Sequence, residues 1–174
     1  MTAQKASSHL PGVIAMTDAP EIDLRVDDDA WLGERQENAL LALAQRALRA
    51  AANHTRSGKV DILLTGDSQM QELNRDWRKK DKPTDVLSFP SDDDAFADGF
   101  LGDIALGFGV VTSDMQTLKR TFDAHVSHLL VHGYLHLLGF DHETEEEAGE
   151  MEPLETKILA DLGHSDPYCL NIEK

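Results

Sequence analysis

The sequence has one cysteine, Cys169, in 174 residues. A single thiol cannot form a disulfide within the chain, so the protein suits a reducing compartment. No stretch approaches the apolar length of a membrane span, and residues 1–20 lack the basic start and long apolar run of a signal peptide. We therefore expect a cytoplasmic protein that does not associate with a membrane.

Basic residues are also scarce: the chain has 16 Lys and Arg but 32 Asp and Glu, which gives a formal net charge of −16. This balance argues against an unspecialised nucleic-acid binder, and we expect no DNA partner, because sequence-independent binding requires cations that neutralise phosphates. Five basic residues nevertheless cluster in residues 74–82, NRDWRKKDK, whereas acids concentrate in residues 91–98 and 143–155. The cluster is either a basic rim that can hold a phosphate chain or a solvated helix end.

The length and the hydrophobic fraction of 41% fit one domain of ordinary size with a packed core. We place this domain at residues 21–174. Residues 1–20 are rich in Ala, Ser, Thr and Pro, show no periodicity and are expected to form a disordered tail. The sequence has no internal repeat and no low-complexity block, so no further division of the chain is indicated.

Apolar periodicity predicts the secondary structure. Strands are predicted at residues 21–26, 59–65, 84–90 and 101–108. Helices are predicted at residues 31–53, at residues 111–123, around the histidine-rich segment, and from a capping box at Thr144 and Glu147 to Leu162. A further short helix is predicted from an N-cap at Asp67 into the basic cluster, with Pro83 as its stop. This order neither alternates strictly nor segregates helices from strands. It predicts an α+β fold, a small four-stranded mixed sheet with about five helices packed on it.

Two details of these helices are also predicted. Met70, Leu73 and Trp77 follow at helical spacing and are expected on the inner side of their helix. Pro153 removes a backbone donor and is expected to kink or split the last helix.

Residues 128–143, HLLVHGYLHLLGFDHE, contain an H-x3-H-x5-H pattern formed by His132, His136 and His142. The first two are four residues apart, so on a helix they project from one face with their imidazoles close enough to share an ion. Gly139 offers the left-handed residue that ends a helix, after which a turn brings the third imidazole to the same point. Three neutral nitrogen donors with room for a water predict a catalytic zinc site on a central helix.

The pattern differs from H-E-x-x-H metallopeptidases, whose glutamate is the general base, because Gly133 stands at that position. A metal site here therefore does not imply peptide hydrolysis. A lone histidine on an apolar helix is usually a core residue, but three at this spacing with a glycine break favour metal binding. Imidazole suits zinc, nickel, copper and iron alike, so other divalent metals stay open.

Three stretches, in this order along the chain, resemble the YbeY endoribonucleases, a family of bacterial maturation factors for ribosomal RNA: LNRDWRKKDKPTDVLSFP, LGDIAL and HGYLHLLGFDH. The stretches AHVSHLLVHG and LGHSDPY also fit, and the resemblance runs from about the first predicted strand to Tyr168. It implies an α+β domain with a four-stranded sheet and helices around it, in agreement with the strands predicted above. Pro153 is a minor departure from the family's pattern, at a position where ordinary helix formers are tolerated.

The resemblance also implies a function. It implies that His132, His136 and His142 bind one metal ion, and that Arg78, which precedes the PTDVLSF segment, is a functional arginine. The implied activity is metal-dependent cleavage of single-stranded RNA, with roles in forming the 3′ end of small-subunit ribosomal RNA and in ribosome quality control. The implied partners are ribosomal RNA and the ribosome or its small-subunit assembly proteins.

The chemistry of the same residues supports phosphodiester hydrolysis. Zinc held by three histidines lowers the pKa of a bound water and polarises a phosphoryl oxygen. The planar guanidinium of Arg78 can bind the charge that builds on phosphorus bidentately, as a lysine cannot. Asp141, next to the last histidine, either orients a ligand imidazole or acts as base in place of the missing glutamate. We favour orientation, with a plain turn residue as the alternative.

Several other residues are open to two interpretations. Asp85 and Asp103, in the two strand motifs, either line the cleft or cap strand ends and keep a sheet edge soluble. His125 and His128 precede the ligands on a similar helix face, where packing or support of the ligands is expected rather than ligation. The glutamates of residues 143–155 either reach the metal site or, as we favour, cap and solvate the last helix.

Two other functions are compatible with these motifs. One is a metal-dependent hydrolase of a peptide or small ester, although the absent glutamate argues against peptides and the basic cluster argues for phosphate. The other is a ribosome-assembly binding factor with a mainly structural metal site, although three ligands with an open position argue against it. We therefore favour a zinc-dependent endoribonuclease.

Overall fold

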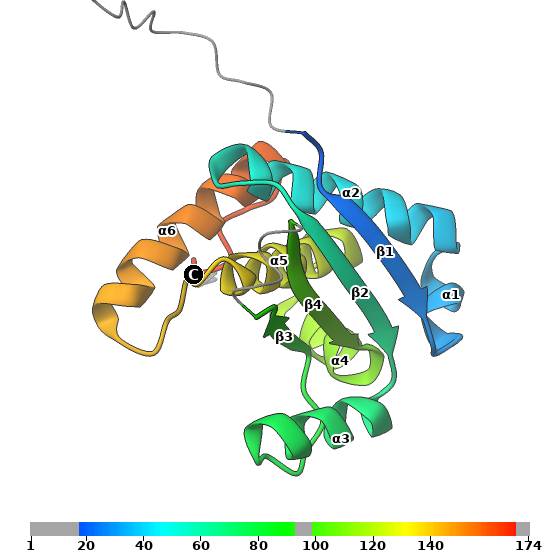
Figure 1. The fold of residues 1–174 in the computed structure, drawn as a ribbon. Coiled ribbons are helices and arrows are strands. Elements are labelled where there is room, and N and C mark those ends of the chain that lie inside the picture. The colour runs from blue at the N-terminus through cyan, green and yellow to red at the C-terminus, as the bar shows by residue number, and fades with distance from the viewer. Residues whose placement is uncertain (1–17, 93–98, 170–174) are drawn as a thin grey trace, which may run out of the picture.

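The structure is a computed structural model that describes residues 18–92 and 99–169. Within these ranges the chain forms four strands and six helices (Figure 1): β1 (Glu21–Val26), α1 (Ala30–Glu34), α2 (Glu37–His54), β2 (Lys59–Thr65), α3 (Asp67–Arg78), β3 (Val86–Pro90), β4 (Phe100–Gly107), α4 (Phe108–Leu118), α5 (Phe122–Leu137) and α6 (Glu145–Asp161). The α+β class and the four strands are confirmed. Residues 1–17 of the predicted tail lie outside the described residues. None of the helices in the described ranges is long and apolar enough to cross a membrane.

The four strands form one mixed sheet in the order β1-β2-β4-β3. β2 pairs in parallel with both β1 and β4, whereas β3, at the edge, runs antiparallel to β4. Parallel neighbours need crossover connections, which α1 and α2 supply between β1 and β2, and α3 and β3 supply between β2 and β4. The mixed sheet is therefore also as predicted.

The two faces of the sheet are covered to different extents. Side chains alternate along the strands, so Ile62 and Ile104 join a main core that includes residues of α2, α5 and α6. On the other face, Leu87 and Ala105 pack with Met70 of α3 in a smaller cluster. The helix with the histidines, α5, thus lies in the larger of the two layers.

The helix predicted at residues 31–53 is divided in two, which raises the number of helices from five to six. α1 ends at Glu34, Arg35 is extended, and α2 begins at Glu37. Trp31 and Leu40 are nine residues apart and would lie on opposite sides of a straight helix. The break brings both into the core, where Trp31 also donates a hydrogen bond from its indole Nε1 to the Thr65 carbonyl.

The helix α3 departs from its prediction at three points. Its N-cap is Gly66 rather than Asp67, whose carboxylate accepts a hydrogen bond from the backbone N–H of Val110 instead. It ends at Arg78, inside the basic cluster as predicted, but the residue that stops it is the left-handed Lys79 rather than Pro83. Trp77, predicted on the inner side, is 69% exposed. It lies at the margin of the incompletely covered sheet face, against the ring of Phe89 in the edge strand.

Three further predictions concern the last three helices. The helix predicted at residues 111–123 is shifted toward the N-terminus, because Thr121 caps the next helix and accepts a hydrogen bond from the N–H of Ala124. α6 runs through Pro153 without a split. The carbonyl left without a donor belongs to Gly149, which is exposed, so water can take the missing place. The predicted capping box of α6 is confirmed.

Candidate metal centre

The helix α5 carries two of the three predicted ligands on consecutive turns. His132 and His136 are half-buried, and their ring centroids lie 4.5 Å apart. At Gly133 the helix lies so close to the sheet that an added Cβ would come within 3.1 Å of Ile104 and Ser88. Metallopeptidases have their general-base glutamate at this position, but in this fold the packing leaves no room for such a side chain.

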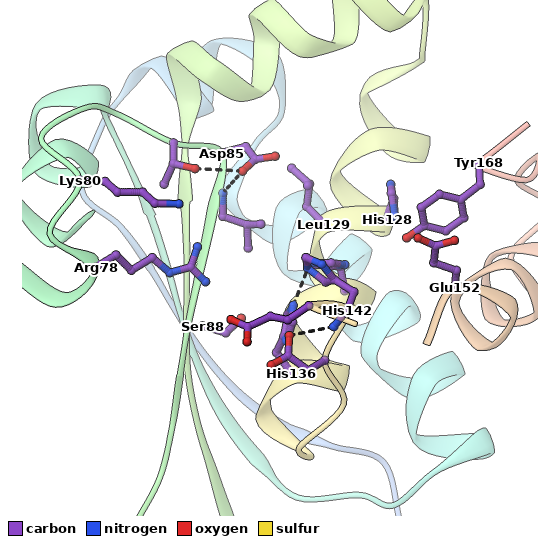
Figure 2. Close-up of a pocket in the computed structure, with 15 residues that line it drawn as sticks. Arg78, Lys80, Asp85, Ser88, His128, Leu129, His136, His142, Glu152 and Tyr168 are labelled. Atoms are coloured by element: carbon purple, nitrogen blue, oxygen red, sulfur yellow. Dashed lines mark hydrogen bonds between the residues drawn. The ribbon is translucent and has the colours of Figure 1, made fainter. Parts of the chain in front are cut away.

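The third histidine reaches the same point after α5 has ended. Gly139 has a left-handed conformation (φ 95°) that turns the chain back. The ring centroid of His142 then lies 5.1 Å from those of His132 and His136. One ring nitrogen from each of the three lies within 4.8 Å of the others. The three imidazoles thus meet at one place on the wall of a cleft (Figure 2).

Hydrogen bonds fix the tautomers of the two helical imidazoles. The Nδ1 atom of His136 lies 2.9 Å from the carbonyl oxygen of Phe140, which can only accept, so this nitrogen carries the proton. The Nδ1 atom of His132 lies 2.5 Å from Oε1 of Glu155. An ionised carboxylate also only accepts, so His132 too is protonated at Nδ1. In the neutral form of each ring, Nε2 then presents a lone pair.

The Nε2 atoms of His132 and His136 lie 3.0 Å apart. When both rings are neutral, neither atom can donate to the other, and a cation held between them and a third donor would satisfy both lone pairs. Nitrogens that share a tetrahedral zinc are separated by ~3.3 Å, given Zn–N distances of about 2.0–2.1 Å. Burial and the neighbouring His132 also lower the pKa of His136, which favours the neutral form of its ring. The residues present therefore fit a zinc ion.

Glu155 was not among the predicted site residues. It lies on α6, and its side chain is fully buried. Burial raises the pKa of its carboxyl, but hydrogen bonds from His128, His132 and Tyr168 outweigh burial and lower the pKa to about 2. A buried carboxylate of this kind orients the imidazole that it contacts and increases the basicity of the opposite nitrogen.

The sequence did contain a signal for Glu155. Met151, Leu154 and Ile158 form the buried stripe of α6, and Glu155 falls within this stripe at helical spacing. A charged residue inside an apolar stripe is rarely buried without a partner. The glutamate run therefore combines two functions, because its start caps and solvates the helix while its end reaches the site.

Arg78 lies across the cleft from the imidazoles. The cleft has a volume of about 690 Å³ and is lined by Arg78 and Lys80 on one side and by the histidines on the other (Figure 2). The basic segment is held in place by the buried Asn74, whose Nδ2 donates to the Lys82 carbonyl at 2.8 Å. Arg78 and the three histidines, far apart in the sequence, therefore share one cavity.

Asp141 also lines the cleft, but its contact differs from the predicted one. Its Oδ1 accepts a hydrogen bond from the backbone N–H of His142 at 2.8 Å. The groups bonded to the imidazoles of His132 and His136 are instead Glu155 and the Phe140 carbonyl. Asp141 therefore holds the backbone of a predicted ligand rather than an imidazole ring.

The remaining candidates separate into those near the cleft and those away from it. Asp85 lines the cleft, whereas Asp103 lies on the other face of the sheet, beside Asp61. His128 supports the site through Glu155. His125 is buried and, among the described residues, neither of its ring nitrogens has a hydrogen-bond partner. Burial, Arg120 and His128 lower its pKa to about 4, so it packs as a neutral ring.

Comparison with known proteins identifies relatives along most of the chain. A family described as Endoribonuclease YbeY matches residues 26–163. Proteins named Endoribonuclease YbeY include one from Rhizobium etli, 43% identical over 85% of this chain and 92% of its own length. Another, from Azorhizobium caulinodans, is 44% identical over 88% of this chain and 99% of its own length.

A solved structure shares the fold. The solution structure of TM1509 from Thermotoga maritima superposes with a TM-score of 0.52 and covers 86% of this chain and 99% of its own. Its sequence identity of 22% makes this a likeness of fold alone.

Proposed function

Because the chain belongs to the endoribonuclease YbeY family, we propose that it is a metal-dependent endoribonuclease that cleaves single-stranded RNA. The observation that carries this proposal is the convergence of one ring nitrogen each from His132, His136 and His142, in a cleft that also holds Arg78. The proposed substrate is ribosomal RNA, with roles at the 3′ end of the small-subunit RNA and in ribosome quality control. The proposed location is the cytoplasm, and the proposed partners are the ribosome or its small-subunit assembly proteins.

We propose zinc as the metal, one ion per chain, held by His132, His136 and His142. A zinc ion in such a site acidifies water and polarises a phosphoryl oxygen, both of which promote phosphodiester hydrolysis. Glu155 and the Phe140 carbonyl already hold two of the rings in the tautomer that binding requires. The protein therefore supplies a preorganised donor set.

The protein's own side chains position the RNA. The guanidinium of Arg78 presents a planar fork of N–H donors that binds two oxygens of one phosphate. Lys80 adds a second cation on this side, whereas Glu152 lies on the opposite, α6 side of the cleft (Figure 2). We therefore place the RNA strand along the α3 side, with the scissile phosphate between Arg78 and the imidazoles. Asp141 is assigned to hold His142 in place through its backbone N–H.

The proposal is tested by metal analysis together with single-turnover cleavage of a single-stranded RNA. We expect about one zinc per chain in the parent, and loss of both zinc and cleavage in His136→Ala. His54→Ala is a matched control, because His54 pairs with Asp161 and does not line the cleft. Zinc retained with no RNA cleavage in the parent would support the structural-metal or non-RNA alternatives, and cleavage retained without zinc would refute metal dependence.

A further inference from the structure

The C-terminal segment returns to the candidate metal centre. The hydroxyl of Tyr168 donates a hydrogen bond to Oε2 of Glu155, the same carboxylate that contacts His132 through Oε1. The Tyr168 ring also packs edge-on against His128, with centroids 5.7 Å apart. Two hydrogen bonds, with Glu155 between them, thus link Tyr168 to a predicted metal ligand, His132.

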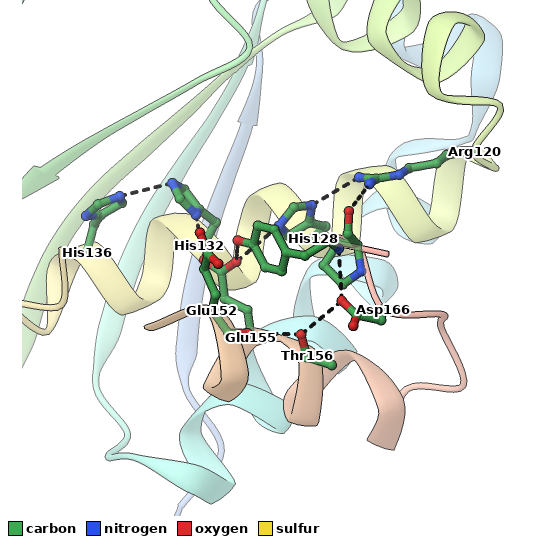
Figure 3. Close-up of polar contacts among 10 residues, drawn as sticks. Arg120, His128, His132, His136, Glu152, Glu155, Thr156 and Asp166 are labelled. Atoms are coloured by element: carbon green, nitrogen blue, oxygen red, sulfur yellow. Dashed lines mark hydrogen bonds and ion pairs between the residues drawn. The ribbon is translucent and has the colours of Figure 1, made fainter. Parts of the chain in front are cut away.

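Two further contacts hold this segment in place. Asp166 accepts hydrogen bonds from the backbone N–H of Tyr168 at 2.9 Å and from the hydroxyl of Thr156 in α6 at 3.2 Å. The guanidinium of Arg120 donates to the Pro167 carbonyl at 2.5 Å. The two residues before Tyr168 therefore fix the segment to α6 and to the turn before α5 (Figure 3).

Arg120 also determines the direction of the hydrogen bonds in this network. A guanidinium has only donors, so the Nδ1 atom of His128, 3.3 Å from Arg120, accepts. The Nε2 atom of His128 then carries the proton and donates to Oε2 of Glu155 at 3.2 Å. Tyr168 and His128 therefore both donate to one oxygen of Glu155, which leaves the other oxygen for His132.

His128, His132 and Glu155 have donor atoms close enough to suggest a second metal site. The separation of 2.5 Å between Nδ1 of His132 and Oε1 of Glu155 argues against this, because two ligands of one zinc stand ~3.3 Å apart. That separation is a hydrogen bond. We therefore assign His128 and Glu155 to the support of the site at His132, His136 and His142, and not to a second metal site.

We propose that Tyr168 is a positioning residue of the metal centre, which it supports through Glu155 and His132. Its hydroxyl and His128 hold the Glu155 carboxylate in the rotamer that orients the His132 ring, so the C-terminal segment sets the affinity of the site for metal. This inference rests on the proposed metal centre, but it does not depend on which substrate is cleaved.

The test compares Tyr168→Phe with Tyr134→Phe in the full chain. Each change removes one phenol hydroxyl, but the hydroxyl of Tyr134 donates to the Arg56 carbonyl, away from the ligands. Zinc affinity is measured by competition with a chromophoric chelator, and the geometry of the site by the visible absorption of the Co²⁺-loaded protein. We expect about tenfold weaker zinc binding and an altered Co²⁺ spectrum for Tyr168→Phe, and neither change for Tyr134→Phe.

A second comparison identifies the route through Glu155. Glu155→Gln keeps the shape of the side chain, and combining it with Tyr168→Phe should weaken zinc binding no more than Glu155→Gln alone, because both changes break the same chain of contacts. Unchanged binding in Tyr168→Phe, or equal losses in both tyrosine variants, would overturn the inference. A parent that binds no zinc would overturn the proposed metal centre and this inference together. A parent that binds zinc tightly without cleaving RNA, with binding weakened in Tyr168→Phe, would overturn the proposed activity alone.

Discussion

The Nδ1 atom of His132 and the Oε1 atom of Glu155 lie 2.5 Å apart, although the two residues belong to different helices, α5 and α6. The carboxylate is fully buried, so its charge is stabilised only by the groups that donate to it. The candidate metal centre and the packing of α6 on α5 therefore depend on each other. Changes in the core between these helices should alter metal binding as well as stability.

Gly133 allows α5 to approach the sheet, and its substitution should show how tight this contact is. Gly133→Ala places a Cβ 3.1 Å from both Ile104 and Ser88, so we expect a net destabilisation of about 1–2 kcal/mol despite the better helix propensity of alanine. Gly149→Ala is the matched control, because Gly149 is also helical but has open space around its Cβ position. There we expect up to ~1 kcal/mol of stabilisation. Urea unfolding measures both, and equal effects in the two variants would contradict a tight contact at Gly133.

Asp103 and Asp61 are register partners on neighbouring strands, away from the cleft. Burial and the charge of Asp61 raise the pKa of Asp103 in the folded protein, so its ionised form opposes folding. This penalty is fully present above the folded-state pKa and disappears as the pH falls below the unfolded-state pKa. Asp103→Asn should therefore stabilise the protein at pH 7, by less than about 1 kcal/mol because solvent screens the pair, and the gain should shrink by pH 4.

Thermal unfolding of the parent and Asp103→Asn at pH 7 and pH 4 checks this sign. A variant that is less stable than the parent at pH 7 would show that the carboxylate makes a favourable contact. A gain of the same size at both pH values would show that it does not arise from ionisation.

Asp141 can be tested through the difference between two substitutions. Asp141→Asn keeps an oxygen that can accept the hydrogen bond from the N–H of His142, whereas Asp141→Ala removes it. If Asp141 holds the ligand backbone, the alanine variant should lose roughly tenfold in zinc affinity and the asparagine variant should lose less. If Asp141 is the general base, both variants should lose the cleavage step while zinc affinity holds. Chelator competition and single-turnover cleavage on the same preparations separate the two roles.

The parts of the site that are local in sequence could be predicted, and those that depend on tertiary packing could not. Helical spacing and Gly139 were sufficient to bring His132, His136 and His142 together, because the geometry of one helix and one turn decides it. Glu155 comes from another helix, and only the packing of α6 on α5 shows that it faces His132.

The same distinction applies to the fold. The four strands followed from short-range periodicity, and all four are present. Trp77 has the spacing of a core residue, yet it is exposed, because spacing does not reveal how far a helix extends over a sheet. The break near Arg35 likewise depends on where Trp31 and Leu40 must pack, which the propensities of those residues do not indicate.

Substitution of Arg78 is the most direct test of whether the protein is an RNA-cleaving enzyme or another kind of metal protein. Arg78 is the last residue of α3, exposed and facing the imidazoles across the cleft, and Lys80 lines the same side (Figure 2). Arg78→Lys keeps the charge but loses the planar fork, so it should slow the cleavage step by more than it weakens RNA affinity, because the lost contacts form mainly in the transition state. Lys80→Gln should instead weaken RNA binding and flatten its dependence on salt, since it removes one phosphate contact.

The matched control for Arg78→Lys is Arg75→Lys, because Arg75 lies on the same helix, pairs with Asp76 and does not line the cleft. Single-turnover cleavage of a single-stranded RNA, with binding and zinc content measured separately, should show a defect of about tenfold or more for Arg78→Lys and none for Arg75→Lys. If Arg78→Lys cleaves at the parental rate while binding and zinc content hold, the planar fork is not needed. Arg78 would then contribute only a charge to the rim of the cleft, and the phosphate would have to be positioned by another group.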